Sequence, residues 1–271
     1  MIEKYEDAAK ASGALMFPQI GIESAPPDLV TWCLASLNRS ELQADTRDVT
    51  VSIHQLKYVA SRLNTSSRLQ LTARSSAPSG GTLATVFTLF ENFTIKEVKA
   101  SHVPFALSPI PHPKPVSTTR SFLGRLTGLA RVPNLGLLTT SLAGMTDAAI
   151  VQRTWGLLST NPSRTGQFYG PNFTFREFMR TPNWLRGMIQ HFAMTVFGMV
   201  LITPPLRKLI WRFVHQPGQG PDRENAKKDR IEYRGVGNPD LEGIGKQAFC
   251  RAHFQGSMYY RKYTSECSSR F

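Results

Sequence analysis

Cysteine and acidic residues are the scarce components of this 271-residue chain. The three cysteines, Cys33, Cys250 and Cys267, form no CxxC pair and no cysteine–histidine spacing typical of a metal site, so we expect no bound metal and a reducing, intracellular compartment. There are 19 acidic residues against 32 lysines and arginines, which gives a formal net charge of +13 and a pI of about 10.0. This basic balance favours anionic partners such as nucleic acid, acidic lipid surfaces or phosphorylated cofactors.

Further absences narrow the class of protein. No zinc-finger spacing, RNP-type run or ladder of basic and aromatic residues is present, which argues against nucleic-acid binding. The first residues, Met1–Asp7, are charged and amphipathic and lack the apolar core of a signal peptide. The histidines are scattered, and only His54, on a predicted strand, is a candidate for a functional role. Because 41% of the residues are hydrophobic, we expect a folded globular protein.

Hydrophobic periodicity predicts a mixture of helices and strands. Gly13 is expected to end the first helix, and Ser24 to cap the second, with Pro26 and Pro27 in its first turn. The predicted helices cover residues 2–12, 25 to about 38, and 81 or 82 to 93, and the predicted strands cover 14–20, 48–56, 148–158, 173–179, 230–236 and 248–254. Residues 57–77 and the proline-rich 101–135 are expected to be loops, and 261–271 an irregular tail.

One long segment, residues 184–214, is unusually apolar. No residue from Gly187 to Leu206 carries a full charge at pH 7, and aromatic and cationic residues flank this stretch. A membrane-spanning helix needs about 20 apolar residues, and here Gln190, His191 and the Pro204-Pro205 pair interrupt the run. Three interpretations remain open: attachment to a membrane surface, a buried core or dimer helix, and a spanning helix.

Two short motifs carry the strongest functional signal. In Pro78-Ser79-Gly80-Gly81-Thr82, consecutive glycines allow backbone amides to approach a ligand at a helix start, although a simple Gly-Gly turn has the same pattern. Loops that follow a strand and open a helix commonly line clefts, and Glu23, Ser24 and Asp28 occupy such a position. The alternative for this second group is helix capping. We therefore expect these residues to line a substrate cleft: Glu23, Ser24, Asp28, Ser79, Gly80, Gly81 and Thr82.

Several ordered motifs resemble the saccharopine dehydrogenase-like oxidoreductases, of the trans-acting enoyl reductase type. The run Phe17–Leu29 is similar to their "G-(F/I)-(D/E)-S-x-P-x-D" segment, and Ser79–Thr82 matches their "S-G-G-T" signature. Later segments that are similar to the family are Tyr169–Phe173, Pro217–Pro221 and Gly256–Tyr259. The resemblance implies an N-terminal Rossmann domain that binds NAD(P), followed by an α+β domain that shapes the substrate site and dimerises.

The resemblance implies an α+β fold, with a C-terminal mixed-sheet substrate and dimerisation domain preceded by the last helix-strand unit of a Rossmann domain. On this basis residues 1–22 are a Rossmann remnant and residues 23–260 the substrate domain. The implied chemistry is hydride transfer from NAD(P)H to an acyl or lipid-like substrate at a membrane or lipid-droplet surface, by a protein that can form homodimers. The alternatives are a cytoplasmic location and a non-catalytic lipid-associated protein that uses residues 184–214.

The sequence departs from the family at three places. The G-x-x-G-x-x-G fingerprint is not found in these residues, so we expect this chain to contain no cofactor-binding residue. Its activity would then be reduced or absent, which leaves open whether the chain is an enzyme. No catalytic residue can be named. Residues 58–75 look inserted and residues 261–271 replace an apolar helix of the family, and translated intron sequence together with a misplaced start at Met1 is one hypothesis for these departures.

Overall fold

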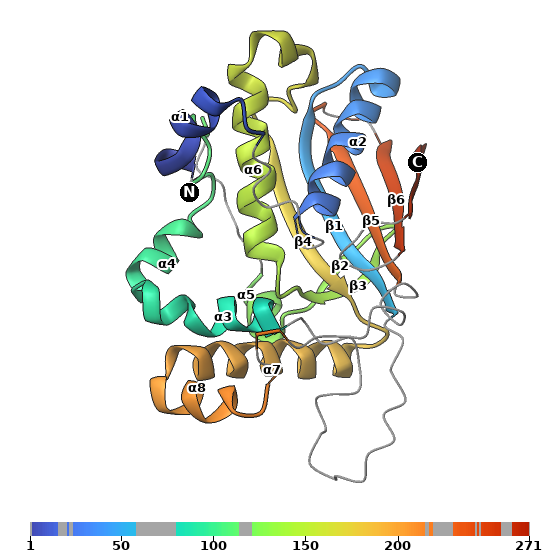
Figure 1. The fold of residues 1–271 in the computed structure, drawn as a ribbon. Helices are drawn as coiled ribbons and strands as arrows, with labels where there is room; N and C mark the ends of the chain where they lie inside the picture. Colours follow the sequence, from blue (N-terminus) through green and yellow to red (C-terminus); the bar gives the residue numbers. More distant parts are fainter. Residues whose placement is uncertain are drawn as a thin grey trace.

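The computed structural model describes residues 2–15, 21, 24–57, 80–113, 121–214, 217–218, 230–241, 243, 245–255 and 262–270. Its helices and strands are mixed along the chain, and the strands join in one sheet (Figure 1), so the predicted α+β class is confirmed. The helices are α1 (Ile2–Ser12), α2 (Ala25–Leu42), α3 (Gly80–Asn92), α4 (Ile95–Ser101), α5 (Phe122–Thr127), α6 (Gly144–Thr160), the 3-10 helix η1 (Pro162–Gln167), α7 (Trp184–Ile202) and α8 (Pro204–Trp211). The strands are β1 (Thr46–Lys57), β2 (Ala130–Val132), β3 (Gly136–Thr140), β4 (Thr174–Arg180), β5 (Arg230–Pro239), β6 (Gln247–Gln255) and β7 (Lys262–Arg270).

The sheet of the described residues has seven strands in the order β2-β3-β4-β1-β5-β6-β7. β1 and β4 pair in parallel, and all other neighbours are antiparallel. Because β1 is central, both of its faces are covered: Val49 and Val51 are buried on one face, and Thr50 and Ser52 on the other. The sequence alternates between apolar and polar residues along this strand, but the polar face is buried as well and does not face solvent.

Helices α2 and α6 cover one face of the sheet and form the main core with it (Figure 1). Two glycines of β5 allow α2 to approach closely, because a Cβ atom on Gly235 would lie 2.8 Å from both Leu34 Cδ1 and Val30 Cγ1. On α6, Trp155 is buried, and its Nε1 donates a hydrogen bond to the carbonyl of Gly170 at 2.7 Å. This packing fixes the position of α2, which carries the predicted cleft residue Asp28 and directly follows Ser24.

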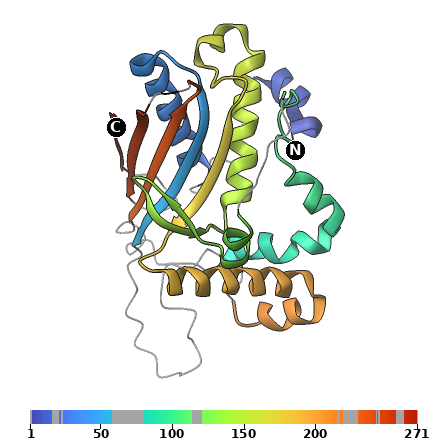
Figure 2. The same ribbon diagram turned by 180° about the vertical axis from the view of Figure 1, so that it is seen from behind.

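A smaller core lies on the other side of the sheet, around the β2–β3 hairpin, which Figure 2 shows from behind. Its buried members are Leu135, Leu138, Phe178, Val236 and Phe249. Beside it, α7 crosses one end of the molecule and contacts β3, α3, α5 and α8 (Figures 1 and 2). The long apolar segment is therefore two helices packed against one end of the sheet domain, with the break at Pro204 as expected from the sequence.

Three secondary-structure predictions are wrong. Residues 148–158 belong to α6, because Ala148, Val151, Trp155 and Leu158 recur at helical spacing and pack in the core. Residues 262–270, predicted as an irregular tail, form the edge strand β7 by pairing with β6, and the exposed residues 266–268 show that this strand does not bury an apolar face along its whole length. The proline-rich stretch 101–135 is not one loop, because it contains α5 and β2.

The other predicted elements agree with the structure where it describes them. The predicted helices at 2–12 and at Gly81, and the predicted strands at 48–56, 173–179, 230–236 and 248–254, are all present with small shifts of their ends. Gly13 ends α1 with φ +69°, as a glycine after a helix often does. In the predicted strand 14–20, Ala14 and Leu15 are not in a strand, and 16–20 lie outside the described residues, as does nearly all of the predicted loop 57–77.

Candidate functional site

The predicted cleft residues lie on two different helices. Ser24 is buried and precedes α2, and its backbone N–H donates a hydrogen bond to the carbonyl of Gly21 at 3.1 Å. Its side chain makes no capping hydrogen bond, so it occupies the predicted N-cap position without the predicted side-chain contact. Gly80, Gly81 and Thr82 form the first turn of α3. Glu23 and Ser79 lie outside the described residues.

The fold places these two groups against different neighbours. α2 packs on β5, β6, β1, α6 and β7, whereas the main helical neighbour of α3 is α7. Figure 1 shows α3 beside α7 at one end of the molecule and α2 along the sheet. Ser24 and Asp28 therefore share one environment, at the interface of α2 with the core, and the glycine motif of α3 has another.

Asp28 is the predicted site residue with the most perturbed chemistry. Thr154 Oγ1, from α6, donates a hydrogen bond to Asp28 Oδ2 at 2.9 Å. The other carboxylate oxygen, Oδ1, is buried and has no hydrogen-bond partner among the described residues. Burial raises the pKa of Asp28 from 3.8 to about 6, although the Thr154 hydrogen bond opposes this change. A carboxyl group of this kind exchanges its proton close to neutral pH, as a general acid or base requires.

Tyr169 lies close enough to Asp28 for their charges to interact. Burial raises the pKa of Tyr169 well above 10, and the negative charge of Asp28 raises it further. The Tyr169 hydroxyl is buried, with no hydrogen-bond partner in the described part of the chain. Sequence reasoning did not select this residue as a site residue, although Tyr169–Phe173 is one of the segments that resemble the oxidoreductase family. Asp28, Thr154 and Tyr169 form the candidate acid–base cluster.

A second polar cluster lies on the sheet face opposite α2. Glu232 accepts hydrogen bonds from Arg234 Nε at 2.6 Å and from Arg251 Nε at 2.8 Å. Burial alone would raise the pKa of Glu232, but the bonds from Arg251 and Arg234 outweigh it and lower the pKa below its usual value. Arg180 contacts His54 Nε2 at 2.7 Å on the same face.

His54, the histidine that the sequence singled out, belongs to this second cluster. Desolvation, followed by the charges of Arg234 and Arg180, lowers the pKa of His54 from 6.5 to about 4. The imidazole is therefore neutral at physiological pH. With three arginines and one glutamate, this cluster carries an excess of positive charge, which suits an anionic group better than a cation. The arginines are far apart in the sequence, so only strand pairing brings them together.

A band of apolar side chains is exposed along α7. It repeats at intervals of four and three residues, and each member is 50–59% exposed: Leu185, Ile189, Phe192, Val196 and Met199. The opposite side of α7 packs on the body of the protein, where Thr139 Oγ1 donates to the carbonyl of Gly187 at 2.8 Å. α7 is long and apolar enough to cross a membrane, which is weak evidence by itself, and only 11% of its most apolar window is buried.

α8 and the turn after it extend the apolar band. Leu206, Leu209 and Phe213 are between 45% and 65% exposed. Lys208 and Arg212 are exposed beside them, and residues 184–214 contain no aspartate or glutamate. Apolar side chains bordered by cations alone are typical of surfaces that contact anionic lipid. We call these residues of α7 and α8 the apolar band below.

The fold brings the three cysteines together, although their spacing in the sequence is not that of a metal site. The sulfur atoms of Cys33, Cys250 and Cys267 all lie within 4.8 Å of one another, although Cys33 is far from the other two in the sequence. The hydrogen bond with Cys267 is the main cause that raises the pKa of Cys250. For Cys267, the bond with Cys250 lowers the pKa, but the contact with Cys33 and burial raise it, to about 11. Cys250 and Cys267 are therefore protonated thiols at neutral pH.

Comparison with known proteins finds no matching family model, no matching curated protein and no matching solved structure.

Proposed function

We propose that this chain is the substrate and dimerisation part of a saccharopine dehydrogenase-like oxidoreductase of the enoyl-reductase type. The ordered sequence motifs, from Phe17–Leu29 to Gly256–Tyr259, carry this proposal. An α+β fold with a seven-stranded mixed sheet is compatible with such a domain, and α1 would be the last helix of the preceding Rossmann domain. The substrate would be an acyl or lipid-like molecule with a double bond that accepts a hydride from NAD(P)H.

Asp28 is the residue that we propose as the acid–base group of this domain. Its pKa of about 6 allows it to hold or release a proton near neutral pH, and Thr154 orients its carboxyl group. Reduction of a polarised double bond needs one hydride and one proton, and the cofactor supplies only the hydride. Asp28 would provide or relay the proton.

A binding experiment tests this proposal. A medium-chain trans-2-enoyl thioester is titrated into the purified chain by calorimetry, and NADPH is titrated in parallel by fluorescence. We expect the thioester to bind and NADPH to bind more weakly than micromolar, because the chain contains no phosphate-binding glycine fingerprint. If no thioester binding is detected, the oxidoreductase proposal fails and the non-catalytic alternative is favoured.

We also propose that the apolar band attaches the protein to a membrane or lipid-droplet surface. α7 is held by contacts on its inner side, including Thr139 with Gly187 and Thr140 with His191 at 2.9 Å. An orientation in the plane of the surface leaves these contacts intact, whereas a spanning orientation would break them. The same attachment would serve a reductase with lipid-like substrates and a non-catalytic lipid-associated protein.

Vesicle flotation tests the attachment. The chain is mixed with vesicles of phosphatidylcholine, with or without phosphatidylserine, at low and at high salt. We expect it to float with the anionic vesicles and to float less at high salt, because each basic side chain near such a surface contributes about 1 kcal/mol, which salt screens. A chain that stays in the soluble fraction with both lipids would rule out the attachment.

A further inference from the structure

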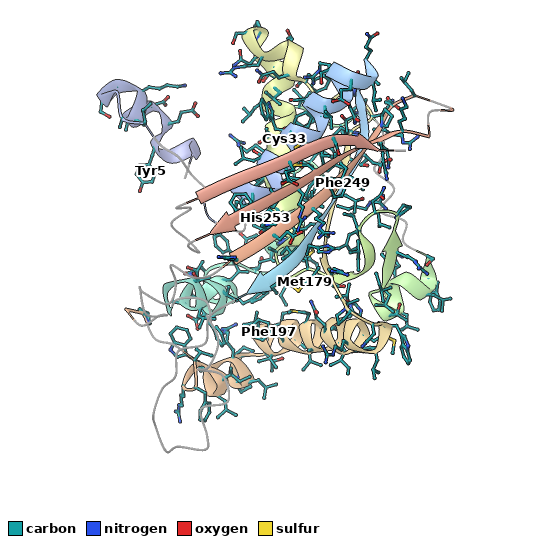
Figure 3. All side chains as sticks on the ribbon, turned by 90° about the vertical axis from the view of Figure 1, so that its right-hand side faces the viewer. Tyr5, Cys33, Met179, Phe197, Phe249 and His253 are labelled. Carbon is teal, nitrogen blue, oxygen red and sulfur yellow. The ribbon has the colours of Figure 1, made fainter. Side chains whose placement is uncertain are left out.

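The cysteine cluster lies outside both proposed functions and has a geometry of its own. Cys33 comes from the middle of α2, Cys250 from β6, and Cys267 from the edge strand β7. Cys250 and Cys267 are directly opposite each other in the antiparallel pair, and Cys267 Sγ donates a hydrogen bond to Cys250 Sγ at 2.9 Å. Figure 3 shows Cys33 on one side of these strands and Phe249 and His253 on the other.

The surroundings of the three sulfurs are apolar and small. Ala248 and Ala252 flank Cys250 on the same face of β6, and Gly235 is its partner on β5. No histidine or carboxylate of the described residues belongs to the group, so its donor atoms are three sulfurs alone. Cys250 is buried, Cys33 is half-buried and Cys267 is exposed, which gives an ion a route from solvent. Such a donor set prefers soft, thiophilic metal ions.

We propose that Cys33, Cys250 and Cys267 bind one divalent thiophilic metal ion, Zn²⁺ being the expected one, through three thiolates. Zinc–sulfur bonds of about 2.3 Å in a tetrahedral site place the sulfurs about 3.8 Å apart, between the 2.9 Å and 4.8 Å found here. Small rotations of the side chains are enough to reach this spacing. Water fills the fourth position on the exposed side of Cys267.

The charge balance favours a divalent ion over Cu⁺. Three thiols lose three protons to solvent on binding, so Zn²⁺ leaves one net negative charge, whereas Cu⁺ would leave two in an apolar setting. No electron is transferred and no oxidant is needed. The bound ion links the edge strand β7 to α2 and to the centre of the sheet, so it stabilises the folded state by binding it in preference to the unfolded chain.

Cobalt binding tests the site directly. The reduced, metal-free chain, with three thiols confirmed by mass spectrometry, is titrated with Co²⁺ and followed by absorbance; Zn²⁺ is then added. We expect one ion per chain, a thiolate-to-cobalt charge-transfer band, and displacement by Zn²⁺. Cys267→Ser and Cys33→Ser should each weaken binding at least about tenfold. Ser268→Ala, on the neighbouring position of β7, is the matched control and should bind as the wild type does.

Thermal unfolding supplies a second measurement, because Zn²⁺ should raise the Tm of the wild type and of Ser268→Ala but not of Cys267→Ser. The proposal is overturned if the reduced chain gives no charge-transfer band. It is also overturned if the Cys33→Ser/Cys267→Ser double variant binds Co²⁺ as tightly as the wild type, since the ion then sits elsewhere. If circular dichroism shows that Cys267→Ser is misfolded, Cys33→Ser replaces it in the Co²⁺ and Tm measurements, with the same expected results.

Discussion

At the scale of single residues, Asp28 shows how the fold changes the chemistry of a side chain that the sequence suggests only by position. A carboxylate in the first turn of a helix is normally stabilised by the helix dipole. Here burial dominates, and the pKa rises to about 6. Sequence reasoning located the residue, but the Thr154 bond and the burial come from α6, which the sequence analysis took for a strand.

Replacement of Asp28 by asparagine should stabilise the protein near pH 8. Since the folded pKa is about 6 and the unfolded value 3.8, the proton-linked stability is present below pH 3.8 and is lost as the pH rises through 6. The difference between the two pKa values corresponds to at most about 3 kcal/mol of stability lost at pH 8. Asp28→Asn should recover part of this stability, because the asparagine amide carries no charge and its oxygen can still accept the Thr154 hydrogen bond. Urea denaturation at pH 4 and pH 8 measures this. Equal stability of the two proteins at pH 8 would show that Asp28 is not desolvated.

A second prediction concerns Glu232, which is the one acid among three arginines in the described part of its cluster. Glu232→Gln should destabilise the protein by about 1–3 kcal/mol, because it weakens two charge-assisted hydrogen bonds and leaves like charges together. Because its folded pKa is lowered, the stability from Glu232 is present above the unfolded pKa and declines as the pH falls through the folded value. Glu6→Gln, in the exposed pair with Lys10, is the control and should change little. A neutral effect of Glu232→Gln would contradict this view.

At the scale of elements, the sequence predicted the strands that lie inside the sheet. It was wrong about segments whose secondary structure depends on their neighbours in the fold. β1, β4, β5 and β6 have branched or aromatic residues that fit a pleated, buried surface. β7 lacks this pattern and is a strand because β6 offers it a free edge. Residues 148–158 alternate in part, but the helical spacing of their buried side chains determines the outcome, as α6.

The position of α7 depends on one aromatic side chain from α3. Phe87 is buried between Phe197 of α7, at 6.3 Å between ring centroids, and Trp211 of α8, at 5.3 Å. Phe87→Ala should destabilise the protein by about 3–5 kcal/mol and loosen α7 and α8 first. Hydrogen exchange should therefore rise in residues 184–211 before it rises in the sheet. Uniform exchange throughout would mean that these helices do not form a separate unit of stability.

At the scale of the whole molecule, local patterns in the sequence predicted the mixture of helices and strands and the apolar segment, and the family resemblance implied the α+β class. The sequence did not predict which residues meet. The cysteine cluster requires α2, β6 and β7 together, and the Glu232 cluster requires the pairing of β4, β1, β5 and β6, so neither leaves a local signature. The separation of Ser24 and Asp28 from the glycine motif is likewise a property of the tertiary arrangement.

The arrangement of the whole molecule also gives the proposed attachment a direction. The helices α7 and α8, which carry the apolar band, lie at one end of the molecule, and α6 runs from there toward the opposite end (Figures 1 and 2). Leu157, near the far end of α6, is 46% exposed and so offers a matched position for an identical change of charge. Glutamate placed on the band should oppose insertion among lipid chains and repel anionic headgroups.

Flotation of three proteins with phosphatidylserine-containing vesicles tests the lipid-surface function most directly. The proteins are the wild type, the Phe192→Glu/Val196→Glu variant on the apolar band, and the Leu157→Glu control on α6. We expect the wild type and the control to float, and the band variant to lose at least about tenfold in vesicle affinity while its circular dichroism is unchanged. If the band variant floats as well as the wild type, the apolar band does not attach the protein to lipid.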